Sequence, residues 1–132
     1  MQAKYILLIV IVIIFITSCQ KPEGVGGTST IKGIATMLEL NSLNEIKDSF
    51  PAYDENIYII YGENEVFDDD IKTHYDGKYI FTNLRKGNYK IFAYSECRGD
   101  SCIAPSIPFI INVEINENNQ TINAPEIIIK NY

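Results

Sequence analysis

Short segments in which apolar and polar residues alternate are the feature that most constrains the fold of this chain. They are rich in isoleucine, tyrosine and phenylalanine and lie at residues 31–40, 56–62, 78–84, 88–95, 109–116 and 126–130. A period of two in β-branched and aromatic residues is typical of strands with one buried face. Turn signals such as Asp76-Gly77 and Lys86-Gly87 separate the segments. We therefore expect an all-β antiparallel sandwich of about seven strands, counting a further strand near residues 71–75.

One segment, NSLNEIKDSFP at residues 41–51, departs from this alternation. Ser42 and Glu45 have the spacing of a capping box, and three apolar residues fall near one helical face before Pro51. This pattern predicts a short helix near residues 42–50. The alternative is an irregular loop pinned by the same three apolar side chains, which must be buried in either case.

The first 18 residues have the layout of an export signal, with Lys4 followed by an apolar run at residues 6–15. The run is about half of the ~20 residues that a membrane-spanning helix needs. ITSC, at residues 16–19, resembles the lipobox of bacterial lipoproteins. The resemblance implies cleavage before Cys19 and lipidation of that cysteine, which would anchor the protein stably to a membrane. An ordinary secretory signal or an uncleaved anchor is the alternative.

The part that would remain after cleavage is acidic and large enough for one domain. It carries 17 acidic and 10 basic residues, a formal net charge of −7, because only Lys4 is lost with the signal. Nucleic acid is therefore not an expected partner. Residues 19–29 hold three glycines and one proline, which predicts a flexible tether after the lipidated cysteine. We expect a β-sandwich domain at residues 30–132 on the outer membrane, on a side that the sequence does not indicate.

Residues 76–95, DGKYIFTNLRKGNYKIFAYS, resemble the signature of the carboxypeptidase regulatory-like, transthyretin-like β-sandwich domains. The matching positions are Asp76, Gly77, Tyr79, Phe81, Leu84, Gly87 and Tyr89. The resemblance implies a Greek-key sandwich over residues 30–130. Gly87 would permit a turn with φ > 0, and the buried Tyr89 could bond back to that turn, as in a tyrosine corner. Such domains serve as spacers, docking modules and assembly parts, so the resemblance indicates a fold and not a reaction.

Catalytic signals are sparse. The sole histidine, His74, lies at an expected turn, and no Gly-x-Ser-x-Gly elbow is present. One transthyretin-like subfamily hydrolyses a purine-breakdown product with histidines, an arginine and a C-terminal Tyr-Arg-Gly-Ser, whereas this chain ends in IIIKNY. We therefore expect no catalytic residue and no cofactor.

An acidic loop supplies three consecutive carboxylates, Asp68, Asp69 and Asp70, which are oxygen ligands of the type that calcium prefers. The loop lacks the spacing of an EF-hand. A solvated turn whose charges blunt the edge of a sheet is the alternative and the favoured interpretation.

Cys97 and Cys102 bracket the tripeptide Arg98-Gly99-Asp100. Exported chains meet an oxidising environment, so we expect a disulfide, which would stabilise the fold by about 2 kcal/mol. The enclosed tripeptide has two interpretations. It is either the tip of a closed turn, for which Gly99 and Asp100 are suited, or an RGD ligand for host integrins. In the second, Asp100 would supply a carboxylate to the receptor's metal and Arg98 a charge to its pocket.

Strand alternation also predicts an unusually apolar outer face. Its expected residues are Tyr58, Ile60, Ile80, Phe92 and Tyr94. Either the segment 42–50 folds over this face or a partner protein covers it. Sugars stacking on the tyrosines are a third interpretation.

These observations predict a membrane-anchored lipoprotein with a non-catalytic β-sandwich module. We expect it to be an accessory part of a cell-envelope assembly and to bind another envelope protein. Two alternatives stay open: a surface adhesin that presents the RGD loop to host integrins, and a binder of glycans or of a secreted ligand.

Overall fold

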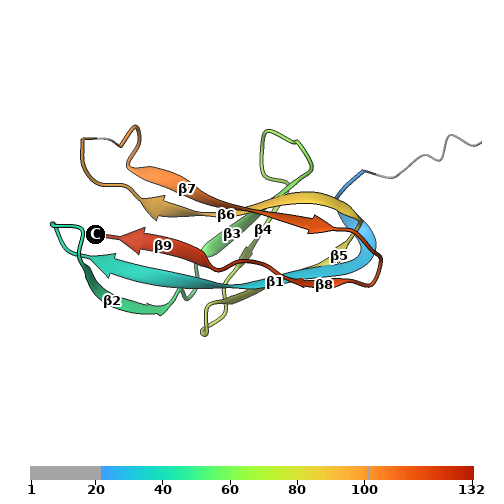
Figure 1. Ribbon diagram of the computed structural model, residues 1–132, viewed down its shortest axis with the longest axis horizontal. Helices are drawn as coiled ribbons and strands as arrows, with labels where there is room; N and C mark the ends of the chain where they lie inside the picture. The colour runs from blue at the N-terminus through green and yellow to red at the C-terminus, as the bar shows by residue number, and fades with distance from the viewer. Residues whose placement is uncertain (1–21, 101) are drawn as a thin grey trace, which may run out of the picture.

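The computed structural model describes residues 22–100 and 102–132, in which two β-sheets lie face to face (Figure 1). The strands are β1 (Val25–Leu40), β2 (Ile46–Pro51), β3 (Asn56–Tyr61), β4 (Asp69–Lys72), β5 (Lys78–Leu84), β6 (Gly87–Glu96), β7 (Ser106–Ile115), β8 (Thr121–Asn123) and β9 (Ile127–Asn131). The described residues contain no helix, so none is long and apolar enough to cross a membrane. The prediction of an all-β sandwich is confirmed.

One sheet contains four strands in the order β4-β3-β6-β7, and all of its pairings are antiparallel. The other sheet is organised around β1, which is 16 residues long. The N-terminal half of β1 lies between β5 and β8, and its C-terminal half lies between β2 and β9. Because β8 and β9 run parallel to β1, this sheet is mixed.

The core lies between the sheets and follows the predicted alternation. Tyr79, Phe81, Tyr89 and Ile91 all point inward and are at least 96% buried. Burying such side chains stabilises the fold by about 1.5–3 kcal/mol each. Other core residues are Ile31, Ala35, Ala52, Ile57, Ile59, Leu84, Ala93, Ile111, Val113, Ile115, Ile127 and Ile129.

The short helix predicted near residues 42–50 is not formed. A tight turn stands there instead, because the side-chain oxygen of Asn41 accepts hydrogen bonds from the N–H groups of Leu43 (2.9 Å) and Glu45 (3.0 Å). Asn44 has a φ of 62°, outside the helical region. β2 follows and pairs with β1. The loop alternative was also wrong, since all the side chains of β2 are exposed.

The sheet content differs from the prediction in two further respects. The described residues form nine strands where about seven were expected, because β2 and the three-residue β8 show no clear alternating pattern in the sequence. The strand expected near residues 71–75 is present as β4 but begins earlier, at Asp69. The pairings of β1 with β8 and β9 are parallel, whereas a wholly antiparallel sandwich was predicted.

The tether predicted for residues 19–29 extends too far, since β1 already begins at Val25. Ser29 is buried; its hydroxyl donates to the Glu117 carbonyl (2.9 Å) and accepts from the Gln120 N–H (3.1 Å). At Gly27 a Cβ would lie 2.0 Å from a backbone oxygen of β5, so only glycine allows β1 and β5 to approach this closely. Cys19 and the start of the predicted tether lie outside the described residues.

Tyr89 forms the tyrosine corner that the sequence predicted. Its buried hydroxyl donates a hydrogen bond to the Arg85 carbonyl (2.7 Å) and accepts one from the Gly24 N–H (3.1 Å). Gly87, with a φ of 139°, lies in the turn between Arg85 and Tyr89. The side chain therefore joins the start of the described chain to the β5–β6 turn.

We predict that Tyr89→Phe lowers the free energy of unfolding by about 1–3 kcal/mol, because it leaves the Arg85 carbonyl and the Gly24 N–H without their buried partner. Urea denaturation of the oxidised protein measures this change. Tyr94→Phe is the matched control: Tyr94 is half exposed, and its hydroxyl bonds to no described residue, so a change within about 0.5 kcal/mol is expected. Equal effects of the two substitutions would contradict the prediction.

Candidate functional site

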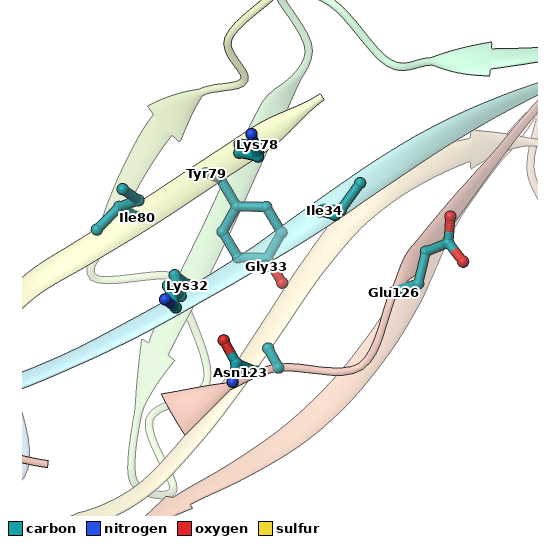
Figure 2. A pocket seen from close by; sticks show the side chains of 9 residues that line it. Lys32, Gly33, Ile34, Lys78, Tyr79, Ile80, Asn123 and Glu126 are labelled. Atoms are coloured by element: carbon teal, nitrogen blue, oxygen red, sulfur yellow. The ribbon is translucent and has the colours of Figure 1, made fainter. Parts of the chain in front are cut away.

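A pocket of about 670 Å³ opens on the sheet that contains β1 (Figure 2). Its residues come from β1, from β5, from the end of β8 and from the segment that joins β8 to β9. They are Lys32, Gly33, Ile34, Lys78, Tyr79, Ile80, Asn123, Ala124 and Glu126. A volume of this size falls within the roughly 300–1,000 Å³ that is usual for small-molecule sites.

The pocket exists because β8 and β9 do not form one continuous strand. Asn123 at the end of β8 pairs with Lys32, and Ile127 at the start of β9 pairs with Ala35. Residues 124–126 therefore leave β1 after a last hydrogen bond from the Ala124 N–H to the Lys32 carbonyl (2.8 Å). This departure leaves a gap beside β1 at the two positions between the paired segments.

Tyr79 reaches this gap from the core side. Its cross-strand partner is Gly33, and its fully buried ring crosses behind β1, so that its hydroxyl lies toward the β8–β9 segment in Figure 2. A Cβ on Gly33 would lie 2.3 Å from the hydroxyl oxygen, so only glycine leaves room for the ring. That oxygen has no hydrogen-bond partner among the described residues. Burial raises the pKa of Tyr79 well above its usual value, which keeps the phenol protonated.

Two of the three charged side chains around the pocket have partners, and one has none among the described residues. Lys78 Nζ lies 2.5 Å from a carboxylate oxygen of Asp76, and the Glu126 carboxylate accepts a hydrogen bond from the Thr36 hydroxyl. Lys32 forms no ion pair or side-chain hydrogen bond with any described residue. The ammonium of Lys32 is therefore the charge that remains free to meet a ligand.

Ile80 lines this pocket and was wrongly assigned to the aromatic outer face. It belongs to β5, in the sheet built on β1, whereas the aromatic residues lie on β3 and β6 in the other sheet. Alternation shows that the side chain of Ile80 points away from the core. It does not show to which of the two sheets the strand belongs, and this explains the error.

The predicted apolar outer face is an aromatic cluster formed by Tyr58, Phe67, Phe92 and Tyr94. Tyr58 stacks on Phe92 with ring centroids 5.0 Å apart, and it also contacts Phe67 (4.8 Å) and Tyr94 (5.6 Å). Phe92 is 6% exposed, whereas Phe67 and Tyr94 are 44% and 49% exposed. Ile110, paired with Phe92, extends the cluster and is 51% exposed.

Only part of this cluster could be predicted from the sequence. Ile60 was expected on the same face and lies next to Tyr58 on β3, where it is half buried. Phe67 was missed, because it comes from the loop before β4, where no alternating pattern reports the direction of a side chain. The segment 42–50, expected as a cover, lies against β1 in the opposite sheet. The ring of Phe67, from the loop before β4, packs onto Tyr58.

A polar pocket of about 380 Å³ lies further along β6 and β7. Strand alternation places Lys90 and its neighbours on the same outer face as Phe92. The polar residues that line it are Glu63, Asn88, Lys90, Asn112 and Glu114. Lys90 Nζ forms an ion pair with Glu63 at 2.8 Å. The outer face of the β6–β7 hairpin thus changes from aromatic to polar along its length.

The disulfide between Cys97 and Cys102 is present, with Cα atoms 5.8 Å apart, as predicted. Arg98, Gly99 and Asp100 are all exposed in the loop between β6 and β7. Gly99 has a φ of 118°, and its carbonyl accepts a hydrogen bond from the Cys102 N–H (3.1 Å). Figure 1 places this loop at one end of the long axis, whereas the described chain begins at the other end.

The three aspartates proposed as calcium ligands have separate environments. The Asp68 carboxylate accepts hydrogen bonds from the Tyr61 N–H (2.7 Å) and the Asn64 amide (2.8 Å), so it closes the loop before β4. Asp69 and Asp70 are successive residues of β4 and alternate in direction. Within residues 22–100 and 102–132, no three His, Cys, Asp or Glu side chains are grouped to hold a metal ion. His74 is exposed at a turn.

Comparison with known proteins gives little further information. No protein-family model and no curated protein matches the chain. A solved structure from Pseudomonas aeruginosa, named a "putative carbohydrate binding protein", is similar with a TM-score of 0.48 and 10% sequence identity; the match covers 86% of this chain and 92% of that one. A likeness this distant supports no conclusion about a ligand.

The unpartnered hydroxyl of Tyr79 predicts a specific dependence of stability on pH. In the unfolded chain a tyrosine ionises near pH 10, whereas folded Tyr79 stays protonated to higher pH because burial raises its pKa. Above pH 10 the unfolded state therefore binds fewer protons, and this residue lowers the free energy of unfolding by about 1.4 kcal/mol per pH unit.

Tyr79→Phe should remove this pH dependence. Because it also removes a buried hydroxyl without a partner, it should raise the free energy of unfolding at pH 7 by about 1–3 kcal/mol. Urea denaturation of both proteins at pH 7, 10 and 11 measures the difference. The same pH dependence in both proteins would show that the hydroxyl of Tyr79 reaches solvent.

Proposed function

We propose that this protein is an exported, lipid-anchored binding module that docks another protein of the cell envelope through its aromatic cluster. The observation that carries the docking role is the cluster on the outer face of β3 and β6, with Tyr94 about half exposed. The ITSC motif at residues 16–19 supports export and lipidation at Cys19.

A protein partner fits the composition of this surface. Tyrosine and phenylalanine are enriched at the centre of protein interfaces, where a few buried aromatic anchors supply most of the binding free energy. Here rings from β3, β6 and the Phe67 loop meet exposed Ile110 of β7 on one sheet face. A contiguous exposed apolar surface on a folded protein commonly marks an interaction site.

The arrangement of the rings favours a protein over a sugar. A sugar stacks on the open face of an aromatic ring, but Tyr58 and Phe92 lie nearly parallel, at 18°, and cover each other. Tyr94 stands edge to face with both of them, at 73° and 88°. The cluster therefore offers an uneven apolar surface that complementary side chains can fill. The polar pocket beside it is the feature that would favour a glycan.

The test is cross-linking in intact cells with C-terminally tagged protein, followed by mass spectrometry of what co-purifies. Tyr94→Glu should reduce the cross-linked partner at least about tenfold, because it places a charge at the desolvated centre of the interface. Tyr94 is half exposed, so the domain should stay folded. Phe92→Glu is less useful, because Phe92 is 6% exposed and a charge there would unfold the domain.

Thr82→Glu is the matched control, because Thr82 is exposed on β5 in the other sheet. It should leave the partner unchanged. Undiminished cross-linking of Tyr94→Glu would exclude the cluster as the interface. If the substitution instead weakens retention on envelope polysaccharide, the ligand is a glycan. Cys19→Ala tests the anchor in parallel, since retention of this variant in the membrane fraction would contradict lipidation.

A second candidate function is integrin adhesion, which the exposure of Arg98-Gly99-Asp100 in a disulfide-closed loop favours. The loop lies at the end of the molecule away from residue 22, so an N-terminal anchor would leave it outermost (Figure 1). The tip of the loop faces open space at Gly99, where a Cβ would meet nothing within 4 Å.

Attachment of integrin-bearing cells to the immobilised protein tests this candidate. Asp100→Glu keeps the charge but lengthens the side chain, so it should abolish attachment if a receptor metal binds the carboxylate. Arg85→Lys, far along the chain from the loop, serves as a control that keeps attachment intact. Equal attachment of the wild type and Asp100→Glu would leave Arg98-Gly99-Asp100 as the tip of a structural turn.

A further inference from the structure

We propose that the pocket at the β8–β9 gap binds a small organic carboxylate with an apolar chain, held by the Tyr79 hydroxyl and the Lys32 ammonium. The pocket lies on the sheet built on β1, whereas the aromatic cluster lies on the other sheet. The two sites are therefore independent, and either proposal can fail without the other.

The Tyr79 hydroxyl is the first support. A buried polar group without a partner destabilises a fold by about 1–3 kcal/mol, so folded proteins rarely leave one. Tyr89 in the same core has both a donor and an acceptor partner, whereas the Tyr79 oxygen has neither among the described residues. A phenylalanine would pack equally well, and Gly33 makes room for the ring that carries this hydroxyl to the gap.

The chemistry of this hydroxyl selects the ligand group. Because the phenol stays protonated, it can donate a hydrogen bond, and a carboxylate oxygen is a stronger acceptor than a neutral one. The hydroxyl is closed off from bulk solvent in this structure, so the ligand must bring its oxygen into the gap beside β1. Residues 124–126 flank the gap without strand pairing to β1, so little backbone bonding opposes a local opening.

The charges of the pocket are the second support. Lys32 and Lys78 project from neighbouring strands on the outer face, in a protein whose net charge is −6. Asp76 already neutralises Lys78, so Lys32 is the ammonium left to attract an anion. Glu126, the carboxylate of the pocket, is held by Thr36, and Figure 2 shows it on the far side of Ile34 from Lys32. An anionic group would therefore settle at the Lys32 side.

The rest of the lining is apolar and accounts for the chain of the ligand. Ile34 and Ile80 are about half exposed, at 45% and 47%, and flank the entrance together with Ala124. Covering these side chains with a hydrocarbon chain stabilises the complex by about 0.8 kcal/mol per buried methylene group. A bare inorganic anion could not use this surface.

The test is a titration of the isotope-labelled protein with butanoate, hexanoate and octanoate, followed by NMR of the backbone amides. We expect saturable shifts at Gly33 and Ala124 that reach half-saturation at lower concentration as the chain lengthens. 1-Octanol has the chain without the charge and should bind about tenfold more weakly. Inorganic phosphate has charge without the chain and should not saturate these shifts.

Two variants test the contacts, and two others serve as controls. Tyr79→Phe and Lys32→Ala should each weaken octanoate binding about five- to thirtyfold, the loss expected for one charge-assisted hydrogen bond. Lys47→Ala removes an exposed lysine on β2 and should leave binding unchanged. Tyr94→Glu should also leave it unchanged, which separates this site from the aromatic cluster.

The proposal is overturned if no carboxylate gives saturable shifts up to about 10 mM, which corresponds to an affinity weaker than that of ordinary specific sites. It is also overturned if octanol binds as tightly as octanoate, because the charge would then have no role. If Lys32→Ala weakens binding and Tyr79→Phe does not, the unpartnered hydroxyl is not a ligand contact.

Discussion

The strand β1 is the element on which the rest of the structure depends. A strand has hydrogen-bonding groups on only two edges, yet β1 pairs with four other strands. It does so by being 16 residues long and by exchanging both neighbours halfway along its length. On one edge of β1, where β2 follows β5, the Gly77 carbonyl accepts a hydrogen bond from the Ala35 N–H, so this edge has no gap. On the other edge, where β9 follows β8, a gap remains. The open side of this exchange is the carboxylate pocket proposed above.

The two faces of the molecule therefore have different origins. On the sheet built on β1, the pocket results from a break in backbone pairing, and a core tyrosine reaches it from the inside. On the four-stranded sheet neighbouring strands pair without a break in register, and the aromatic cluster results from side chains. A ligand at the first face would give one buried hydroxyl its hydrogen-bond partner. A partner at the second would gain from apolar area, and the two surfaces suit different kinds of molecule.

Much of the fold could be predicted because strand alternation and turn chemistry are local. The inward residues Tyr79 and Tyr89, the corner at Gly87 and the Cys97–Cys102 disulfide all follow from spacing within about ten residues. The rest depends on contacts between distant segments. Ser42 was expected to cap a helix, but Asn41 forms a turn there instead. The pairing of β2 with β1 competes with the helix, and the local sequence pattern does not report it. No sequence signal could report that Gly33 would lie over Tyr79 or that Phe67 would reach Tyr58.

The parallel arrangement of β1 and β9 has a mechanical consequence. These strands lie at opposite ends of the described sequence but run side by side in the same direction, with five residue pairs in register. Tension between the N-terminal side and the C-terminus would load their hydrogen bonds together, in shear, so the bonds could not open one after another. Tyr89 and Ser29 fasten the start of β1 to other elements, which spreads the same load into the second sheet. The pairing of β1 with β9 should therefore resist a force applied between the two ends of the described chain.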